Sequence, residues 1–458
     1  MRNLNISMRA AAALAASIGL LAFVSGARAQ ENGVTPSEIS IGAIGALTGP
    51  LAFIGAPGRD SMTMAFEEIN AKGGVCGRKL ALGFEHASSP AESIAAVKKL
   101  VEQDKVFILV LASGSTGAAA AADYVRQAGV PTYNLYGSTP IIRNPFAKNV
   151  FHGAVVPVEV SAAALISMFY DGGYTPKKFG LLAGTYAFPQ ATLKAAQDIL
   201  KQKGADVTVE QFDIGARDFT SQLVSLQRQN VDSVLLLGSF SEAGFAIKQA
   251  RELGMTNVRW VVDGSAVSTA IIPILGNADG IRGYYNAPAF PGQTPATREF
   301  EARLKKHLGS LPQGRPSIYD LIGYGSGYVV AEAIKATNCQ LTRGNLIDAW
   351  SGLKDAGPTL LGGLDVTFPE SYAPTDHQGV YRIGAAIVKD GQWQVYRVID
   401  KPCPRPCSPS WDLSSSRASN SARSTRWRRL ASSSCTRRQR PSTSPTERSR
   451  CWARSRAS

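Results

Sequence analysis

The sequence predicts an α/β protein built from two doubly wound lobes. The main observation is that short apolar runs alternate with helical patterns in two successive series, over residues 39–135 and again over 179–262. Several runs, such as 106–112, are apolar at almost every position, which is typical of parallel strands buried on both faces. In addition, the roughly 370 residues between the two unusual ends of the chain exceed the length of one typical domain.

The first series opens with an apolar run over 39–44, which predicts a strand. The following helical pattern over 60–72 ends at a Gly-Gly pair, as helices commonly do. A proline early in its first turn favours the next helix, over 90–103. The other elements predicted here are strands over 80–84, 106–112 and 130–135 and an alanine-rich helix over 114–128.

The second series repeats this alternation and is followed by a mainly helical section. Glycines at 323, 325 and 327 lie within a helical pattern, and we expect them to allow close packing. The predicted elements are strands over 179–183, 207–212, 234–237, 260–262, 380–388 and 393–399, and helices over 189–203, 219–229, 242–253, 294–308, 318–335 and 343–353.

The first thirty residues predict export. Arg2 and Arg9 precede an apolar run over 10–26, and an Ala-Arg-Ala site follows, so we expect a signal peptide over 1–29 that is cleaved after Ala29. The apolar run is shorter than the ~20 residues of a membrane-spanning helix, and an uncleaved anchor is the weaker alternative. We therefore expect the mature protein in the periplasm.

The formal charge of +14 comes from the two ends of the chain. Residues 404–458 contain 13 arginines, no lysine and two acidic residues, whereas residues 30–403 carry equal numbers of acidic and basic residues. A segment dominated by Ser, Arg and Pro cannot bury a core, so we expect disorder there. A nucleic-acid-binding arm is one interpretation. Out-of-frame translation accounts better for arginine without lysine, and we expect no nucleic-acid partner.

Six cysteines are few for this length, and three of them lie in the basic tail. The remaining Cys76, Cys339 and Cys403 permit one disulfide in an oxidising compartment. Cys339 with Cys403 is the pair that we expect, although the sequence alone does not establish it. No cysteine and histidine cluster has the spacing of metal ligands, so we predict neither a metal site nor a cofactor.

Two hydroxyl-rich loops follow neighbouring strands of the first series. Ser113-Gly114-Ser115 leads into the alanine-rich helix, whose first backbone N–H groups could hold a carboxylate. A plain helix cap by Ser113 or Ser115 is the alternative. Tyr136, Ser138 and Thr139 follow the next strand, and both loops should lie at the same edge of the sheet, where such folds bind ligands.

Loops of the second series add aromatic and acidic side chains at the corresponding edge. Tyr186 and Phe240 each follow a predicted strand and could form an apolar wall, although plain packing is the alternative. Asp263 ends another strand, where it could pair with a ligand ammonium group or cap a turn.

Three segments resemble the leucine/isoleucine/valine-binding family of periplasmic solute-binding proteins, which serve ATP-binding-cassette (ABC) importers. The first of them corresponds to the family's opening strand and loop, and the resemblance extends over residues 38–400. The segments are 41–52 (IGAIGALTGPLA), 65–75 (AFEEINAKGGV) and 249–254 (QARELG).

This resemblance implies the type I periplasmic binding protein fold, in which two lobes share the chain and a three-strand hinge joins them. We place the hinge crossings near Ala154, Asn286 and Val366. Ligand binding would stabilise closure of the lobes about this hinge. The expected divisions are 30–154 and 287–366 for lobe 1, 155–286 and 367–403 for lobe 2, and 404–458 for the tail.

The resemblance also implies roles for the loop residues. Two departures from the family pattern are Ile54 in place of an aromatic and a segment beginning at Glu85 in place of an Asp-rich one. The expected ligand is a small carboxylate such as a branched-chain or other hydrophobic amino acid or an aromatic acid, and because of these departures amides and urea-like solutes, which related members carry, also stay open. The implied roles are carboxylate binding by Ser113 and by the turn containing Tyr136, Ser138 and Thr139, aromatic contacts from Tyr186 and Phe240, and ammonium binding by Asp263.

We therefore expect a monomeric binding protein and no catalytic site. No nucleophile-elbow, zinc-protease or phosphate-loop motif occurs, so an exported hydrolase is the weaker alternative. The expected partners are a small carboxylate ligand and the permease subunits of an ABC importer. A module that feeds a sensor or chemoreceptor would have the same lobes, and it stays open as an alternative.

Overall fold

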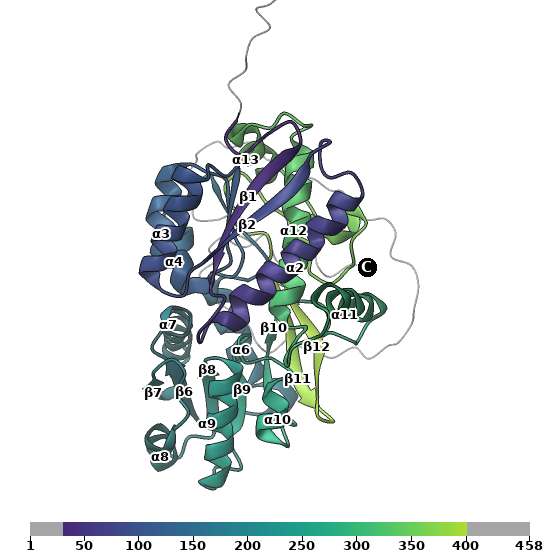
Figure 1. The fold of residues 1–458 in the computed structure, drawn as a ribbon. Helices are drawn as coiled ribbons and strands as arrows, with labels where there is room; N and C mark the ends of the chain where they lie inside the picture. Colours follow the sequence, from purple (N-terminus) through teal and green to yellow (C-terminus); the bar gives the residue numbers. More distant parts are fainter. Residues whose placement is uncertain (1–30, 401–458) are drawn as a thin grey trace, which may run out of the picture. The chain divides into compact units, whose positions relative to one another are not determined.

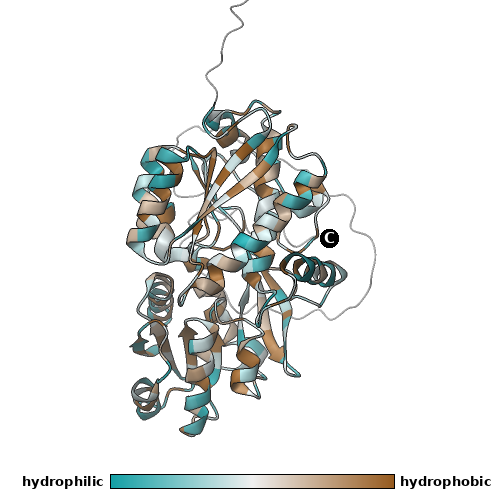
Figure 2. Cartoon of the chain, viewed as in Figure 1, coloured by the Kyte–Doolittle hydropathy of each residue, from teal (hydrophilic) through white to brown (hydrophobic). Residues whose placement is uncertain are grey.

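The structure is a computed structural model that describes residues 31–400. The signal peptide expected over 1–29, the tail over 404–458 and Cys403 lie outside the described residues. The described chain forms a five-stranded and a seven-stranded sheet, each flanked by helices (Figure 1). The strands are largely hydrophobic, whereas the helices alternate between hydrophobic and hydrophilic residues (Figure 2). The predicted class, two doubly wound α/β lobes, is confirmed.

The first sheet is parallel throughout and has the order β2-β1-β3-β4-β5. Ile108 and Val110 of β3 face a core shared with α2 and α12, whereas Leu109 and Leu111 face α3 and α4. Helices therefore cover both faces, which explains why β3 is apolar at every position. The elements are β1 (Glu38–Gly45), α2 (Ala52–Ala71), β2 (Lys79–His86), α3 (Pro90–Lys98), η1 (Lys99–Gln103), β3 (Ile108–Leu111), α4 (Gly114–Ala128), β4 (Thr132–Asn134), α5 (Pro140–Arg143), β5 (Val150–His152), α11 (Pro295–Leu308), α12 (Ile318–Ala336), α13 (Arg343–Ser351) and η3 (Pro358–Leu361).

The second sheet has the order β12-β11-β10-β9-β8-β6-β7. Five of its strands are parallel, and the hairpin β11–β12 adds an antiparallel edge. Its loops after β6, β8 and β9 lead toward the functional site. The elements are α6 (Val158–Met168), η2 (Asp171–Gly173), β6 (Lys178–Gly184), α7 (Ala187–Gln202), β7 (Asp206–Phe212), α8 (Thr220–Arg228), β8 (Ser233–Leu237), α9 (Phe240–Glu252), β9 (Arg259–Val262), α10 (Ile271–Leu275), β10 (Arg282–Tyr285), β11 (Arg382–Lys389) and β12 (Gln392–Asp400).

Helices α2 and α12 pack side by side and run in the same direction. A Cβ added at Gly323 would lie 2.9 Å from the carbonyl oxygen of Gly58, so this close approach requires glycine, as expected from the sequence. Both helices end on the same side, which brings Cys76 and Cys339 together in a disulfide. The expected pair Cys339–Cys403 is therefore wrong, because helix packing makes neighbours of two cysteines that are 263 positions apart.

The elements that the sequence analysis missed or shortened lack a strong local pattern, each for its own reason. β5 and β10 are three and four residues long, too short for a periodic pattern. α6 is buried around most of its circumference and so lacks an amphipathic stripe. Helix α2 begins at Ala52, whereas the sequence analysis placed its start at residue 60. The glycines and Pro57 in its first turns are typical of a loop, so the sequence pattern concealed the start of the helix.

The division into lobes remains a prediction. Contacts between elements indicate where the chain passes from one lobe to the other. Ala154 lies between β5 of the first sheet and α6, and Asn286 directly follows β10 of the second. Residues after Val366 still contact the first sheet, since Glu370 accepts hydrogen bonds from Tyr133 and residue 378 pairs with β5. We therefore propose that the third crossing lies between residue 378 and the start of β11.

Candidate ligand-binding site

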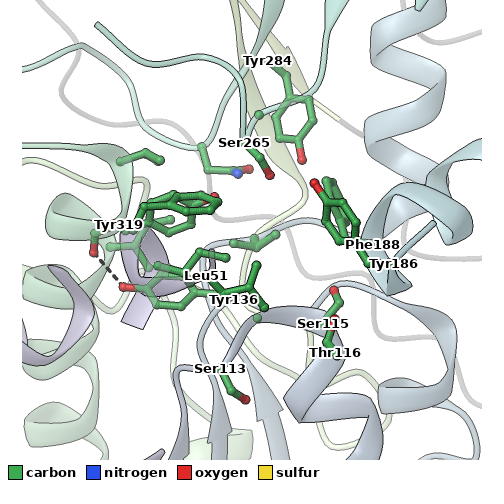
Figure 3. Close-up of a pocket in the computed structure, with 18 residues that line it drawn as sticks. Leu51, Ser113, Ser115, Thr116, Tyr136, Tyr186, Phe188, Ser265, Tyr284 and Tyr319 are labelled. Carbon is green, nitrogen blue, oxygen red and sulfur yellow. Dashed lines mark hydrogen bonds between the residues drawn. The ribbon is translucent and has the colours of Figure 1, made fainter. Parts of the chain in front are cut away.

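A cavity of about 50 Å³ lies where strand-end loops of both sheets meet (Figure 3). The loops after β1, β3 and β4 contribute from the first sheet, and those after β6, β9 and β10 from the second. None of the lining residues is charged at neutral pH. They are Leu51, Phe53, Ile54, Ser113, Gly114, Ser115, Thr116, Tyr136, Val155, Tyr186, Phe188, Gly264, Ser265, Tyr284, Asn286, Ile318, Tyr319 and Ile322.

The N-terminus of α4 borders this cavity. Ser113 occupies the N-cap position but makes no side-chain cap hydrogen bond. Gly114 has a φ of +66°, a left-handed conformation that suits glycine and turns the chain into the helix. The first-turn N–H groups of Ser115 and Thr116 are therefore left without a side-chain cap beside the cavity, where the helix dipole favours an anion.

The two predicted serines of this loop differ in their contacts. The Ser115 hydroxyl accepts a hydrogen bond from the Ser138 backbone N–H at 3.1 Å, which ties the loops after β3 and β4 together. The Ser113 hydroxyl is buried and has no partner among the described residues. It points toward Gly117, where an added Cβ would lie 2.4 Å from it. In the view of Figure 3, Ser113 lies below Tyr136 and apart from Ser115 and Thr116.

Ser138 and Thr139 lie behind the cavity wall and not on it. Both side chains are buried, at 1% and 4% exposure, and within residues 31–400 neither hydroxyl has a hydrogen-bond partner. The Ser138 carbonyl accepts from Arg143 at 2.7 Å. Two buried hydroxyls without partners are costly in a folded protein, so they are available to a ligand or to water if the loop shifts.

Four tyrosines surround the cavity: Tyr136, Tyr186, Tyr284 and Tyr319. The Tyr136 hydroxyl donates to the backbone carbonyl of Tyr319 at 2.7 Å, and their rings meet edge to face at 5.2 Å. Burial raises the pKa of each phenol above its ordinary 10, so all four remain protonated and neutral at physiological pH. In Figure 3 the hydroxyls of Tyr284 and Ser265 point toward the space between the rings.

Glu242 fixes the loops of the second sheet, although it does not line the cavity. It is 1% exposed, and its carboxylate accepts from the Tyr186 hydroxyl at 3.0 Å and from the Ser239 and Gly215 backbone N–H groups at 2.7 Å each. Together with Ser239 it forms the capping box of α9. One buried carboxylate therefore holds the loops after β6, β7 and β8.

Asn286 supplies an amide at the cavity. Its side chain is 6% exposed, and its oxygen has no partner in the described chain. Because the oxygen and nitrogen of the amide exchange places by rotation, Asn286 can offer either an acceptor or a donor. The polar groups at the cavity are thus hydroxyls, backbone N–H groups and one amide.

Asp263 is close to the cavity but is not one of its lining residues. Its side chain is fully buried, and its two oxygens accept from the Gly238 N–H at 2.7 Å and the Ser265 N–H at 2.6 Å. Burial raises its pKa to about 7, and these hydrogen bonds oppose the rise. Both oxygens are engaged by backbone, so the ammonium role stays a prediction that this geometry does not favour.

Phe240 lines a second cavity, of about 270 Å³, next to the first. Its ring meets that of Phe53 edge to face at 5.9 Å. The structure thus places Ser113, Ser115, Tyr136 and Tyr186 on the first cavity, Phe240 on the second, and Ser138, Thr139 and Asp263 on neither.

Several lining residues were not predicted. Ser265 follows a predicted strand, so the loop that contains Asp263 already pointed to it. Tyr284 and Asn286 lie on or just after β10, which the sequence analysis missed. Tyr319 and Phe53 lie in the first turns of α12 and α2, where aromatic residues resemble ordinary packing.

Two negative findings apply to the part of the chain that the structure describes. Within residues 31–400, no group of three or more His, Cys, Asp or Glu residues is placed to hold a metal ion. Over the same range, no helix has both the length and the apolar character that a bilayer crossing needs.

Comparisons with known proteins agree with this architecture. The family model of periplasmic binding proteins matches residues 38–392. A leucine/isoleucine/valine-binding protein homologue from Brucella abortus is 27% identical over 323 residues, which cover 67% of this chain and 79% of that protein.

Solved structures show the same fold. A branched-chain amino acid transporter substrate-binding protein from Streptococcus pneumoniae, in complex with isoleucine, has a TM-score of 0.66 at 21% identity and covers 78% of this chain and 98% of its own. A solute-binding protein of an ABC transporter from Rhodopseudomonas palustris, in complex with 3,4-dihydroxybenzoic acid, has a TM-score of 0.67 at 22% identity. The match covers 79% of this chain and 97% of that protein. The chain therefore belongs to the periplasmic binding protein family, within its leucine/isoleucine/valine-binding-like group, whose members are solute-binding proteins and not enzymes.

Proposed function

We propose that this protein is the periplasmic solute-binding component of an ABC importer and that its solute is a small organic acid without an α-amino group. The observation that carries this proposal is the uncharged cavity that borders the uncapped N-terminus of α4. Backbone N–H groups, the Ser115 hydroxyl and the hydroxyls of Tyr284 and Tyr319 can donate to a carboxylate, whereas Tyr136 and Tyr186 already donate within the protein. Rotation of the Ser113 side chain would add a further donor.

The uncharged lining disfavours an amino acid. A ligand ammonium group would need an acidic partner, because burying an unpaired charge costs several kcal/mol. No acidic side chain lines the cavity, and both oxygens of Asp263 are occupied by backbone N–H groups. We therefore favour aromatic and aliphatic acids, in line with the ligand of the R. palustris protein, over the isoleucine of the S. pneumoniae protein.

The energetics are sufficient for a transport receptor. A micromolar complex requires about 8 kcal/mol. Charge-assisted hydrogen bonds to the carboxylate contribute about 1.5–3 kcal/mol each before desolvation is subtracted. Burial of an apolar ligand body adds about 1.5–3 kcal/mol.

Aromatic side chains from helix starts next to the two sheets contact one another at the cavities. Phe53 on α2 and Phe240 on α9 already meet edge to face, and Tyr319 packs against Phe53 at 5.6 Å. These rings come from loops and helix starts next to both sheets, so a ligand between them would favour the closed state.

Isothermal titration calorimetry with a matched ligand set tests the proposed ligand class. The set is 4-hydroxybenzoate, its neutral amide 4-hydroxybenzamide, 4-methylpentanoate and L-leucine, which is 4-methylpentanoate with an added α-amino group. We expect the acid to bind at least tenfold more tightly than the amide, and 4-methylpentanoate more tightly than L-leucine. Equal affinity for acid and amide would contradict carboxylate recognition at α4.

Two serine-to-alanine variants, one at the cavity and one on the surface, test the site itself. Ser115→Ala removes a cavity hydroxyl and the acceptor of the Ser138 N–H, so we expect a five- to tenfold loss of acid affinity, about 1 kcal/mol. Ser221→Ala, on the exposed face of α8, should leave affinity unchanged.

For the importer role, uptake of the labelled acid should be lost in a deletion strain. Intact uptake together with a lost chemotactic response would favour the sensor alternative.

A further inference from the structure

The second cavity adjoins the first and is about five times larger, at about 270 Å³ compared with about 50 Å³. The two cavities share lining residues, including Phe53, Ser265 and Tyr319. The Phe53 and Tyr319 rings meet edge to face at 5.6 Å. Because both rings line both cavities, they form the boundary at which a ligand would pass from one to the other.

The walls of the second cavity are mainly apolar and firmly packed. Phe240, Val267 and Phe290 are among its lining residues. Phe290 is 3% exposed and stacks on Tyr285 at 3.9 Å and on Trp393 at 6.2 Å. Because these rings pack against one another, the wall of the cavity keeps its shape. Because the lining is mainly apolar, the cavity favours an apolar occupant over water.

The charge at this cavity is already balanced. Arg315 is the one charged lining residue, and its guanidinium pairs with Asp60 at 2.6 Å and Asp320 at 2.5 Å. The three side chains are 11%, 11% and 0% exposed, respectively. The described walls therefore offer no unpaired charge that would select a charged group on the ligand.

The two cavities differ in their polar groups and in size, because the uncapped N-terminus of α4 borders only the first and the second is larger and mainly apolar. The second cavity has the greater space of the two, so the longer part of a ligand would lie there.

From these observations we propose that the second cavity is the subsite for the apolar body of the ligand. The ligand class is then a monocarboxylic acid with an alkyl or arylalkyl chain that extends past Phe53 and Tyr319. The proposal rests on the proposed function for the position of the carboxylate. It goes further in requiring affinity to depend on chain length.

Calorimetry with straight-chain acids from butanoate to decanoate tests this inference. Each methylene group that enters the apolar subsite should tighten binding about fourfold until the cavity is full. Ala270→Phe places a large side chain on the wall of the second cavity, away from the first, and should abolish this gain while leaving butanoate affinity unchanged. Ala71→Phe, at the exposed end of α2, is the matched control and should leave the whole series unchanged.

The possible outcomes separate the two proposals. If short acids bind but longer acids bind no more tightly, or if Ala270→Phe leaves the gain intact, the tail subsite is wrong and the carboxylate site stands. If the neutral alkyl amides bind as well as the acids and show the same chain-length dependence, the tail subsite stands and carboxylate recognition is wrong. If no acid of any length binds, both proposals are overturned.

Discussion

The buried carboxyl group of Asp263 permits a sharp test of how the site is supported. Asp263 accepts from the backbone N–H groups of Gly238 and Ser265, and Ser265 lines the cavity. In Asp263→Asn the side chain keeps its shape but offers one acceptor oxygen to two donors. We expect Ser265 to move as a result, so that the variant weakens every acid ligand.

The pKa of Asp263 determines how the variant should depend on pH. Burial raises this pKa from its ordinary 3.8 to about 7. Between these values the folded protein holds a proton that the unfolded chain does not, so this group favours folding at low pH and the benefit is lost as pH rises to about 7. At 1.36 kcal/mol per pH unit the whole effect is roughly 4 kcal/mol, of which about 3 kcal/mol falls between pH 5 and pH 8.

Urea denaturation at pH 5 and pH 8 measures this effect. Relative to the unmodified protein, Asp263→Asn should gain about 3 kcal/mol of unfolding free energy between pH 5 and pH 8, because the asparagine does not titrate. Glu332 and Glu370 also have pKa values raised to about 7, but they titrate in both proteins and cancel in the difference. Asp198→Asn, on the exposed surface of α7, removes a carboxyl group without touching the site and is the control.

Two results would refute this reasoning. A stability difference that is the same at both pH values would show that Asp263 does not titrate in this range. In the binding arm, Asp263→Asn should weaken L-leucine and 4-methylpentanoate by the same factor. A loss confined to L-leucine would instead establish Asp263 as the ammonium ligand.

Two further predictions concern the disulfide and the turn before α4. Replacing both Cys76 and Cys339 with serine should lower the unfolding free energy, measured in urea, by about 2–5 kcal/mol. Acid affinity should stay within twofold, because the disulfide lies beyond the C-terminal ends of α2 and α12 whereas the cavities adjoin their N-terminal ends. Lost binding would show that the disulfide shapes the site. Gly114→Ala should cost about 1–2 kcal/mol and at least tenfold in acid affinity, since Gly114 is left-handed at the cavity. Gly172→Ala, at an exposed left-handed position, should lose similar stability without losing affinity, and equal losses of affinity in both variants would contradict the role of Gly114.

The sequence allowed prediction of those parts of the fold that have a strong local pattern. Strands such as β3 and β8 are continuous apolar runs because helices cover both their faces, and this burial is visible in composition. β5, β10 and α6 are defined by their neighbours and not by a period of their own, so no local pattern marks them. The same limit applies to the disulfide, which depends on the packing of α2 against α12.

The site divides in a similar way. Ser113, Ser115, Tyr136 and Tyr186 follow predicted strands, and the parallel sheets bring these strand ends to one cavity. Side-chain direction is not encoded in such a pattern, which is why Ser138, Thr139 and Asp263 fall behind the wall. Tyr319 and Phe53 enter the cavity from helix starts, a position that a search of loops after strands does not examine.

The attachment of Tyr186 to Glu242 has a consequence for how ligand preference can evolve. Exchanging Tyr186 for a smaller residue would reshape the cavity but would also leave a buried carboxylate with one donor fewer, so the change carries a folding penalty. Phe188 faces the same cavity, and its side chain has no such polar tie in the described structure. Substitutions that change ligand preference should therefore occur at Phe188 first. A change of Tyr186 should come later and together with a change of Glu242.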